Sequence, residues 1–327
     1  MNTSSLQPRL GIVLMAMAAG VLPGLALAAD IYPSKPITIV VPYPPGGSND
    51  VFARQVAKGL SDSMKIAVIV DNRAGASGNI GSTLVAKAAP DGYTLLVTSS
   101  SMTTNAATLQ TMPFDPVSGF APVAMFAKGP FIVAVNESVK ARTPAELMSL
   151  VKANPGKLNY ATSGNGSSNQ FATELLKSMS GTDIVHVPYK GMGPAVTDLL
   201  GGQVQILIAS GPSLLPQLRG GKIHAVGITS AKPHPIAPEL KPMAVAVPGY
   251  DFELWWGLLA PAGTPPAIID QLNAEVNKVI RSAALKEYFL KEGAEVTPST
   301  PAEFATTIAA DIARWRKLAK QQSITAD

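Results

Sequence analysis

The chain has 327 residues and no cysteine, with 26 Lys and Arg against 22 Asp and Glu and a formal net charge of +4. This small, scattered basic excess does not indicate a nucleic-acid groove, which concentrates positive charge on one surface. Without disulfides the fold depends on burial of apolar side chains, which a chain of this length can supply. His186, His224 and His234 lack the spacing of metal ligands, so we expect no metal site.

An apolar leader follows Arg9 near the N-terminus. A basic residue, a short apolar core and small residues at Ala26 and Ala28 together form the pattern of a secretory signal peptide, residues 1–28, cut after Ala28. A retained membrane anchor is the weaker alternative, because Pro23 and Gly24 interrupt the run and no charged stop-transfer flank follows. We therefore expect an exported protein.

Strand and helix patterns alternate from residue 37 onward, with joints rich in Gly, Ser, Asn and Pro. Such alternation predicts an α/β fold with mostly parallel sheets. In the first helix, for example, Val56, Leu60 and Met64 fall on one stripe. In this N-terminal part we expect strands at residues 37–41, 66–71 and 94–98, and helices at residues 49–64 and 78–89.

A second α/β unit begins after Arg142. Thr143 and Glu146 form the pattern of a capping box, with Pro144 at the first helical position, which predicts a helix to about residue 153. Beyond it we expect strands at residues 158–162, 184–187, 204–209 and 225–229, and helices at residues 169–180, 194–200 and 214–219.

The second unit is predicted to be inserted in the first. Two long amphipathic helices, at residues 265–281 and 301–321, have no lobe of their own and most simply pack on the N-terminal lobe. Two lobes joined by two strands form a hinged clamshell, in which ligands bind at the carboxyl ends of the strands. The predicted bounds are residues 29–128 and 251–327 for lobe 1, residues 129–250 for lobe 2, and crossing segments at residues 131–135 and 255–260.

The first candidate binding loop, residues 43–50, lies between a strand and a helix. Two prolines fix its path, and two glycines let the backbone come close to a guest. The helix start supplies unpaired N–H groups and a partial positive charge, which favour an anion. A tight turn capped by Ser48 or Asn49 explains the same residues equally well.

A second loop of the same kind, residues 163–169, opens a helix in the other lobe. Its glycines and hydroxyls offer donors from the opposite direction, and two helix N-termini facing across a cleft suit a carboxylate. The loop is not a dinucleotide fingerprint, because Asn169 stands where the third glycine belongs. P-loop and Gly-x-Ser-x-Gly patterns are also absent from the sequence, so we expect neither a cofactor nor a serine hydrolase.

Six blocks of sequence lie at residues 42–47, 72–81, 90–96, 160–168, 186–191 and 256–265, beginning with Pro-Tyr-Pro-Pro-Gly-Gly. Together they resemble the substrate-binding proteins of tripartite tricarboxylate transporters, also called the Bug family. The resemblance implies a periplasmic binding protein of type II, a Venus-flytrap clamshell with two crossing strands. It also implies a small carboxylate ligand and delivery to the permease subunits of such a transporter. We expect a monomer and no nucleic-acid partner.

Carried over by position, the resemblance assigns ligand contacts to both loops, to the loop after residues 94–98 and to the turn after residues 184–187. Two side chains depart from many relatives, Gln170 in place of His and Gln205 in place of Asp. If that Asp receives a ligand ammonium group, Gln205 argues against an amino-acid ligand, unless position 205 merely ends a strand. The predicted ligand-binding residues are Tyr43, Gly47, Ser48, Asp50, Thr98, Ser99, Ser100, Ser163, Gly164, Asn165, Gly166, Ser167, Ser168, Gln170, Pro188, Tyr189 and Gln205.

Four other side chains have two interpretations each. Lys190 either lines the cleft or is a solvated surface charge. Arg54 either contacts ligand or pairs with Asp50 at i, i+4 spacing. One of Trp255 and Trp256 could stack on a ligand, while core packing is the expected fate of at least one of them.

Residues and resemblance together predict a periplasmic solute-binding protein for a di- or tricarboxylate or an aromatic carboxylate, which works by closing its lobes on the ligand. One alternative keeps the same pocket and signals to a sensor kinase in place of a permease. An exported enzyme with Asp50 or His186 as acid or base is disfavoured, because the sequence lacks a nucleophile elbow, a metal cluster and paired catalytic carboxylates.

Overall fold

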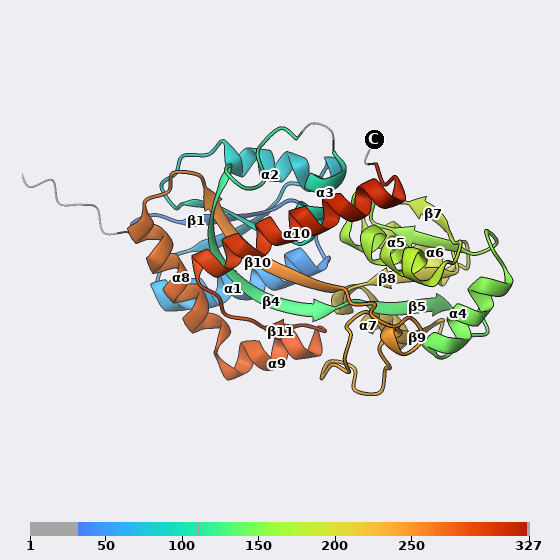
Figure 1. Ribbon diagram of the computed structural model, residues 1–327. Coiled ribbons are helices and arrows are strands. Elements are labelled where there is room, and N and C mark those ends of the chain that lie inside the picture. Colours follow the sequence, from blue (N-terminus) through green and yellow to red (C-terminus); the bar gives the residue numbers. More distant parts are fainter. Residues whose placement is uncertain (1–31, 110–111, 326–327) are drawn as a thin grey trace, which may run out of the picture. The chain divides into compact units, whose positions relative to one another are not determined.

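Short apolar runs assemble into a six-stranded and a five-stranded sheet in the computed structural model, which describes residues 32–109 and 112–325 (Figure 1). Residues from Tyr32 onward belong to one compact unit. The predicted signal peptide lies outside the described residues. In the described part, no helix combines the length and hydropathy that a membrane span needs.

The first sheet joins the N-terminal strands to strands that return from the second sheet, in the order β11-β4-β10-β3-β1-β2. β2 and β3 run parallel to β1, whereas β10 is antiparallel to β3 and β4. β1 and β3 are buried along nearly their whole length, as expected for strands covered on both faces. The strands are β1 (Ile37–Val41), β2 (Val68–Asn72), β3 (Thr94–Ser99), β4 (Phe120–Pro130), β10 (Glu253–Pro261) and β11 (Glu295–Val296).

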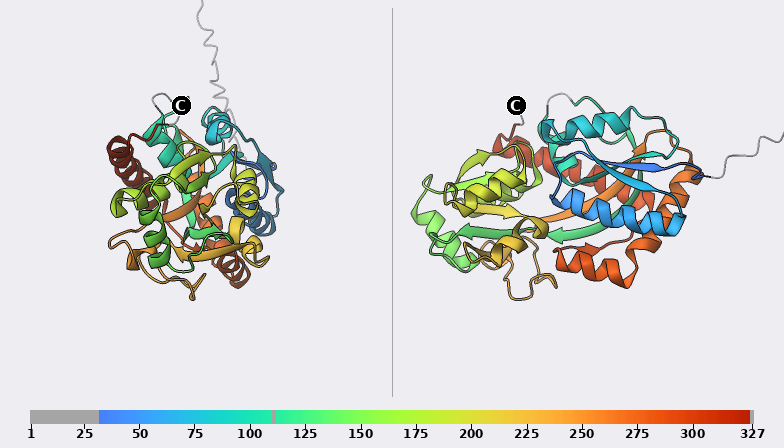
Figure 2. Two further views of the ribbon diagram at one scale, coloured as in Figure 1. Left: turned by 90° about the vertical axis from the view of Figure 1, so that its right-hand side faces the viewer. Right: turned by 180° about the vertical axis from the view of Figure 1, so that it is seen from behind.

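Helices lie on both sides of this sheet (Figures 1 and 2). Helix α1 buries Phe52, Val56 and Leu60, which share one helical face. Thr300 and Glu303 form a reciprocal capping box at the start of α10, and both α8 and α10 contact β4, while α10 also reaches α5. The elements are α1 (Ser48–Met64), η1 (Ala76–Gly78), α2 (Asn79–Ala86), α3 (Ser101–Thr108), α8 (Pro266–Ile280), α9 (Ala283–Lys291) and α10 (Pro301–Gln322).

The second sheet has the order β7-β6-β8-β5-β9. β6 runs parallel to β7 and β8, whereas β5 is antiparallel to β8 and β9. Its strands are β5 (Ile132–Asn136), β6 (Asn159–Thr162), β7 (Val185–Pro188), β8 (Ile206–Ala209) and β9 (Ile223–Ile228). Its helices are α4 (Pro144–Ala153), α5 (Ser168–Ser180), α6 (Met192–Leu200), α7 (Gly211–Leu218) and the short η2 (Met243–Val245).

The chain passes between the sheets at two adjacent points. Phe131 separates β4 from β5, and Phe252 precedes β10 on the way back. Their rings stack with centroids 5.7 Å apart, and Thr229 hydrogen bonds to both backbones, receiving the Phe252 amide at 2.9 Å. Phe131 alone separates β4 from β5, whereas Phe252 ends the segment that follows β9 and includes η2. The predicted crossing at residues 131–135 begins at Phe131 and continues into β5, and the predicted crossing at residues 255–260 lies within β10. The bounds of the two lobes remain a prediction.

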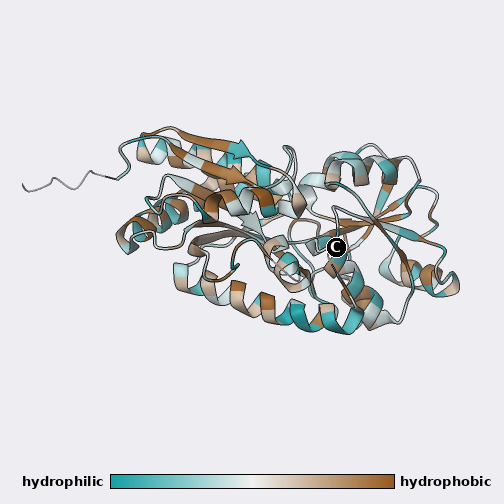
Figure 3. Ribbon diagram, turned by 90° about the horizontal axis from the view of Figure 1, so that it is seen from above, coloured by the Kyte–Doolittle hydropathy of each residue, from teal (hydrophilic) through white to brown (hydrophobic). Residues whose placement is uncertain are grey.

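Two sheets that pack against helices confirm the predicted α/β fold class. Figure 3 shows largely hydrophobic strands and helices of mixed polarity. The sheets are mixed rather than mostly parallel, because strands that pass between sheets pair antiparallel with their neighbours. The predicted capping box of α4 is half formed. Thr143 accepts the Glu146 amide, but the Glu146 carboxylate receives the Arg142 amide at 2.6 Å.

Candidate functional site

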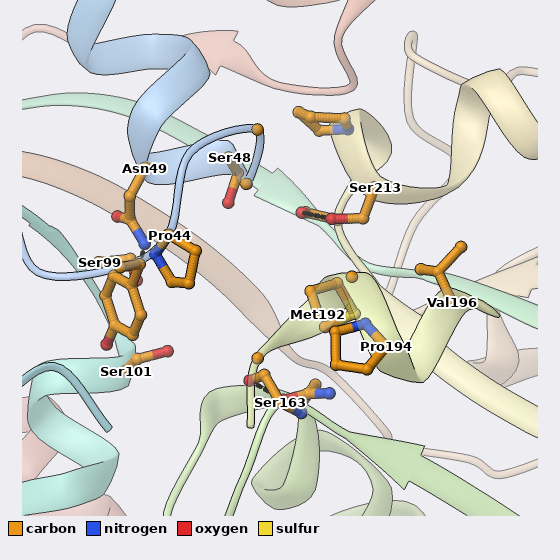
Figure 4. A pocket seen from close by; sticks show the side chains of 18 of the residues that line it. Pro44, Ser48, Asn49, Ser99, Ser101, Ser163, Met192, Pro194, Val196 and Ser213 are labelled. Carbon is orange, nitrogen blue, oxygen red and sulfur yellow. Dashed lines mark hydrogen bonds between the residues drawn. The ribbon is translucent and has the colours of Figure 1, made fainter. Parts of the chain in front are cut away.

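A cavity of about 450 Å³ lies beyond the carboxyl ends of β1, β3, β6 and β8. Its walls come from the β1–α1 loop, the start of α3, the β6–α5 loop and helices α6 and α7 (Figure 4). Phe131 and Leu254, beside the two crossings, add apolar surface. The cavity therefore lies where residues of both sheets converge, as predicted for ligand binding at the carboxyl ends of strands.

Asp50 stabilises the conformation of the first loop through hydrogen bonds from a position outside the cavity wall. Its carboxylate accepts the Gly46 amide at 3.0 Å and the Asn72 amide at 3.0 Å, and pairs with Arg54 at 2.8 Å. Burial alone would raise the pKa of Asp50, but the hydrogen bonds from Arg54, Gly46 and Asn72 hold it below its usual value. Asp50 does not line the cavity. Asp50 supports the loop in this structure, so ligand contact at Asp50 remains a prediction, while the predicted pair with Arg54 is present.

The first turn of α1 faces the cavity with Ser48 and Asn49 (Figure 4). The indole N–H of the fully buried Trp256 donates to Ser48 Oγ at 3.2 Å, so the core positions this hydroxyl. Asn49 is 8% exposed, and its Oδ1 has no hydrogen-bond partner among the described residues. Gly47, at the N-cap, has no side chain to receive the first-turn amides. This turn therefore keeps polar groups available for a guest.

The two tryptophans belong to the core. Trp255 is 2% exposed and donates its indole N–H to Asp311 at 2.7 Å, and Trp256 is fully buried against Phe52. Neither lines the cavity. Of the two interpretations of these side chains, core packing fits both, and Trp256 reaches the site only through Ser48.

The second loop also keeps a buried donor for the cavity. Gly164 and Gly166 have φ of 133° and 76°, which only glycine adopts readily, so the chain can curl around the start of α5. Asn169 Oδ1 accepts the Ser163 hydroxyl at 3.1 Å. Asn169 is 2% exposed and lines the cavity, yet its Nδ2 has no partner among the described residues. A buried amide N–H without an acceptor is costly, so Asn169 is the polar group of this loop whose hydrogen bonding is incomplete.

His186 supports this loop from beneath the cavity. Gln170 Oε1 accepts the Gly166 amide at 2.8 Å, so its NH₂ group faces His186 Nδ1 at 3.3 Å. His186 Nε2–H then donates to the Thr162 hydroxyl at 2.7 Å. Burial lowers the pKa of His186 to about 4, so the ring is neutral at physiological pH. Gln170 and His186 do not line the cavity, and ligand contact at Gln170 remains a prediction.

Direct contacts join the two sides of the cleft. The Ser101 and Ser168 hydroxyls lie 2.9 Å apart, and Ser77 Oγ donates to the Asn165 carbonyl at 3.3 Å. Ser77 is itself held, because its carbonyl accepts Asn105 Nδ2 at 2.6 Å. These bonds link the first-sheet side to the second loop, so the cavity is enclosed on this side.

The structure brings six of the predicted residues to the cavity wall: Tyr43, Gly47, Ser48, Ser99, Ser163 and Ser168. Eight others stand in the same loops and turns but do not line it: Thr98, Ser100, Gly164, Asn165, Gly166, Ser167, Pro188 and Tyr189. Tyr189, for example, is engaged with Asp198 through a hydrogen bond of 2.6 Å. Lys190 does line the cavity and is exposed. Ligand contact at any of these positions remains a prediction.

Gln205 lies at the opposite end of the second sheet. Its side chain accepts the Asn159 amide at 2.9 Å and donates to the Gly202 carbonyl at 3.2 Å. Asn159 and Ile206 begin β6 and β8, whereas the cavity adjoins the other ends of these strands. Gln205 therefore precedes β8 rather than ending a strand, and it lies away from the cavity. The ligand contact at Gln205, and with it the inference about an amino-acid ligand, remains a prediction.

Part of the wall comes from residues outside the predicted set. Asn49 and Asn169 both stand at helix starts, and the position of an Asn beside a helix N-terminus is the signal that could have identified them. The larger omission is the face of α6, with Met192, Val196 and Leu200 at i, i+4 and i+8. In sequence this stripe is indistinguishable from a face that packs in the core. Among the described residues, no group of three or more His, Cys, Asp or Glu side chains is placed to hold a metal ion.

Comparisons with known proteins agree with this geometry. A family model described as "Tripartite tricarboxylate transporter family receptor" matches residues 52–324. The chain is 37% identical to Protein BugT of Bordetella pertussis over 324 residues, covering 98% of each chain. An R. palustris protein solved with adipate is 36% identical, with a TM-score of 0.86 over 90% of this chain and 99% of that one. MatC from Rhodopseudomonas palustris, solved with bound malate, is 30% identical, with a TM-score of 0.81 over 88% and 99%.

These matches confirm the predicted resemblance and the two-lobed clamshell. The matched family and solved structures are solute-binding receptors of the periplasmic type, not enzymes. The prediction of a binding protein rather than an enzyme is therefore confirmed.

Proposed function

The chain belongs to the tripartite tricarboxylate transporter receptor family, and from this premise we propose that it captures a small carboxylate in the cavity for delivery to a membrane permease. We further propose that it is exported to the periplasm, where its lobes close on the ligand and the closed form docks on the permease. The solved relatives support a carboxylate, because one carries adipate and another malate.

The buried, unpartnered amide of Asn169 carries this proposal. It lies at the start of α5 and lines the same cavity as Ser48 and Asn49 in the first turn of α1. Helix N-termini favour negative charge, and each charge-assisted hydrogen bond contributes about 1.5–3 kcal/mol. Asn49 Nδ2 donates to Ser99 Oγ at 3.5 Å, and a rotated Asn49 amide would turn this donor toward the same guest. A few such bonds, after ordering costs, are compatible with binding at about −8 kcal/mol, near micromolar Kd.

The two groups proposed for acid–base chemistry are occupied elsewhere. The Asp50 carboxylate receives three donors, and both ring nitrogens of His186 have partners. Neither side chain lines the cavity. The site thus offers hydrogen-bond donors around a ligand, which supports ligand binding and lobe closure rather than acid–base catalysis as its function.

Calorimetric titration of the purified mature protein with succinate, citrate, adipate, benzoate and glutamate tests the proposal. We expect at least one acid to bind stoichiometrically and to be recovered unchanged. Asn169→Ala should weaken that acid about tenfold or more, because it removes the free donor. Asn154→Ala is the matched control, since Asn154 caps the distant end of α4. Turnover of the acid, or full affinity in Asn169→Ala, would contradict the proposal.

A further inference from the structure

One face of α6 forms the cavity wall beyond the paired helix N-termini. Met192, Val196 and Leu200 are spaced four residues apart, so they form a single stripe, and all three line the cavity. Eight residues of α-helix rise by about 12 Å, so this apolar wall extends well past a carboxylate head bound near Asn169. Phe131 and Leu254 add apolar surface from the crossings.

Charged groups are scarce along this wall. Among the described residues that line the cavity, Lys190 alone has a charged side chain, and it is exposed and precedes the stripe. Thr197, Ser213 and Gln217 complete the far region with uncharged groups. Figure 4 shows Ser213 and Val196 on the side of the cavity away from Ser99 and Ser101. A second carboxylate placed there would lose hydration without meeting a buried cation.

Helix α7 begins at this far region but offers few free donors to an anion. Pro212 in its first turn has no N–H, and the Ser213 amide already donates to the Ser210 carbonyl at 3.1 Å. The Ser210 and Ser213 hydroxyls lie 3.4 Å apart and can bond to each other. The far region therefore lacks the buried, unpartnered amide that marks the head region at Asn169.

We infer that the cavity selects a monocarboxylate with an extended apolar body, whose head is bound between α1 and α5 and whose body lies along the α6 stripe. The inference rests on the proposed function and narrows its ligand class. It separates this chain from its relatives solved with adipate and malate, both of which are diacids.

Octanoate and octanedioate test the inference by calorimetry, because they have the same length and differ only in the terminal group. Octanoate should bind at least tenfold more tightly. An equal or tighter Kd for octanedioate would overturn the inference and leave the proposed function standing. If neither acid binds while succinate or citrate does, the inference falls and the proposed function stands; if no acid of either series binds, both fall.

Two variants show whether the stripe is responsible. Met192→Lys places a cation on the wall and should reduce the preference for octanoate at least tenfold. Met179→Lys is the matched control, because Met179 is 41% exposed on α5 and outside the cavity wall, and its preference should equal that of the wild type. Asn169→Ala should weaken both acids by the same factor, since both carry the head group. An unchanged preference in Met192→Lys, or an Asn169→Ala loss confined to one acid, would overturn the assignment.

Discussion

At the start of α1 an ionised carboxylate holds the binding loop, whereas at the start of α5 an uncharged amide and imidazole hold the corresponding loop. Asp50 collects Gly46, Asn72 and Arg54 near the surface. Gln170 and His186 secure Gly166 and Thr162 in a more buried place. In both arrangements the N-terminus of a helix points at the same cavity. The loop before α1 is stabilised by a charged network, and the loop before α5 by an uncharged one.

The two networks should differ in how the free energy of unfolding changes at low pH and when a side chain of the network is replaced. The pKa of Asp50 is below its usual value, so its network stays charged into the acid range. The pKa of His186 is also lowered, to about 4, but from an ordinary value of 6.5. The uncharged support therefore responds to acid first. Four predictions test this contrast.

The largest effect is expected from Asp50→Ala. The Gly46 amide and the Asn72 amide lose their acceptor, and we expect a loss of about 2–3 kcal/mol in the free energy of unfolding. Ligand affinity should fall as the loop relaxes. Urea denaturation and calorimetry measure the two effects. Asp50→Asn is the control of similar shape and should lose less, while a change below about 0.5 kcal/mol in Asp50→Ala would contradict the supporting role.

Gln170→Ala tests the uncharged support. The Gly166 amide and His186 Nδ1 lose their partner, so we expect a loss of about 1–2 kcal/mol and weaker ligand binding. Gln321→Ala, on an exposed position of α10, should leave both quantities unchanged. Equal stability of the two variants would show that Gln170 and His186 do not stabilise the loop.

Acid titration should separate the loops. Between pH 6.5 and about 4 the unfolded chain takes up a proton at His186 that the folded protein excludes, so stability falls as pH is lowered through this window. Allowing for the partial exposure of the ring, we expect about 1 kcal/mol. Stability supplied by Asp50 is lost only as the pH falls below 3.8.

Urea denaturation of the wild type and of His186→Gln over this pH range measures the contribution of His186 to the pH dependence of stability. The variant should lose the dependence between pH 6.5 and 4 and keep the one at lower pH. An identical pH profile in the variant and the wild type would show that His186 does not distinguish the loops.

Arg54→Gln should have the smallest effect. The Arg54 side chain is 51% exposed, and exposed i, i+4 pairs contribute about 0.3–0.5 kcal/mol. Raising the salt concentration to 0.5 M should erase the difference from wild type by screening the pair. A loss above about 1.5 kcal/mol would show that Arg54, rather than the neutral donors, dominates the Asp50 network.

Local chemistry in the sequence predicted both loops and the Asp50–Arg54 pair. Prolines, glycines and helix starts act within a few residues of themselves, and an i, i+4 pair needs only its own helix. Gln205 directly precedes β8, so the predicted strand at residues 204–209 already placed it away from a site at the carboxyl ends of the strands. The hydrogen bond between Gln205 and the Asn159 amide could not be predicted, because it depends on the parallel pairing of β6 and β8.

The sequence by itself determined the α/β alternation, the two strand-to-helix loops and the family resemblance, because these rest on short-range patterns. The tertiary structure alone decided which groups face the ligand. Asn169 and Gln170 are neighbours at the start of one helix, yet one side chain lines the cavity and the other binds His186 beneath it. Successive helical residues point about 100° apart, and only the packing of distant segments decides which direction is open.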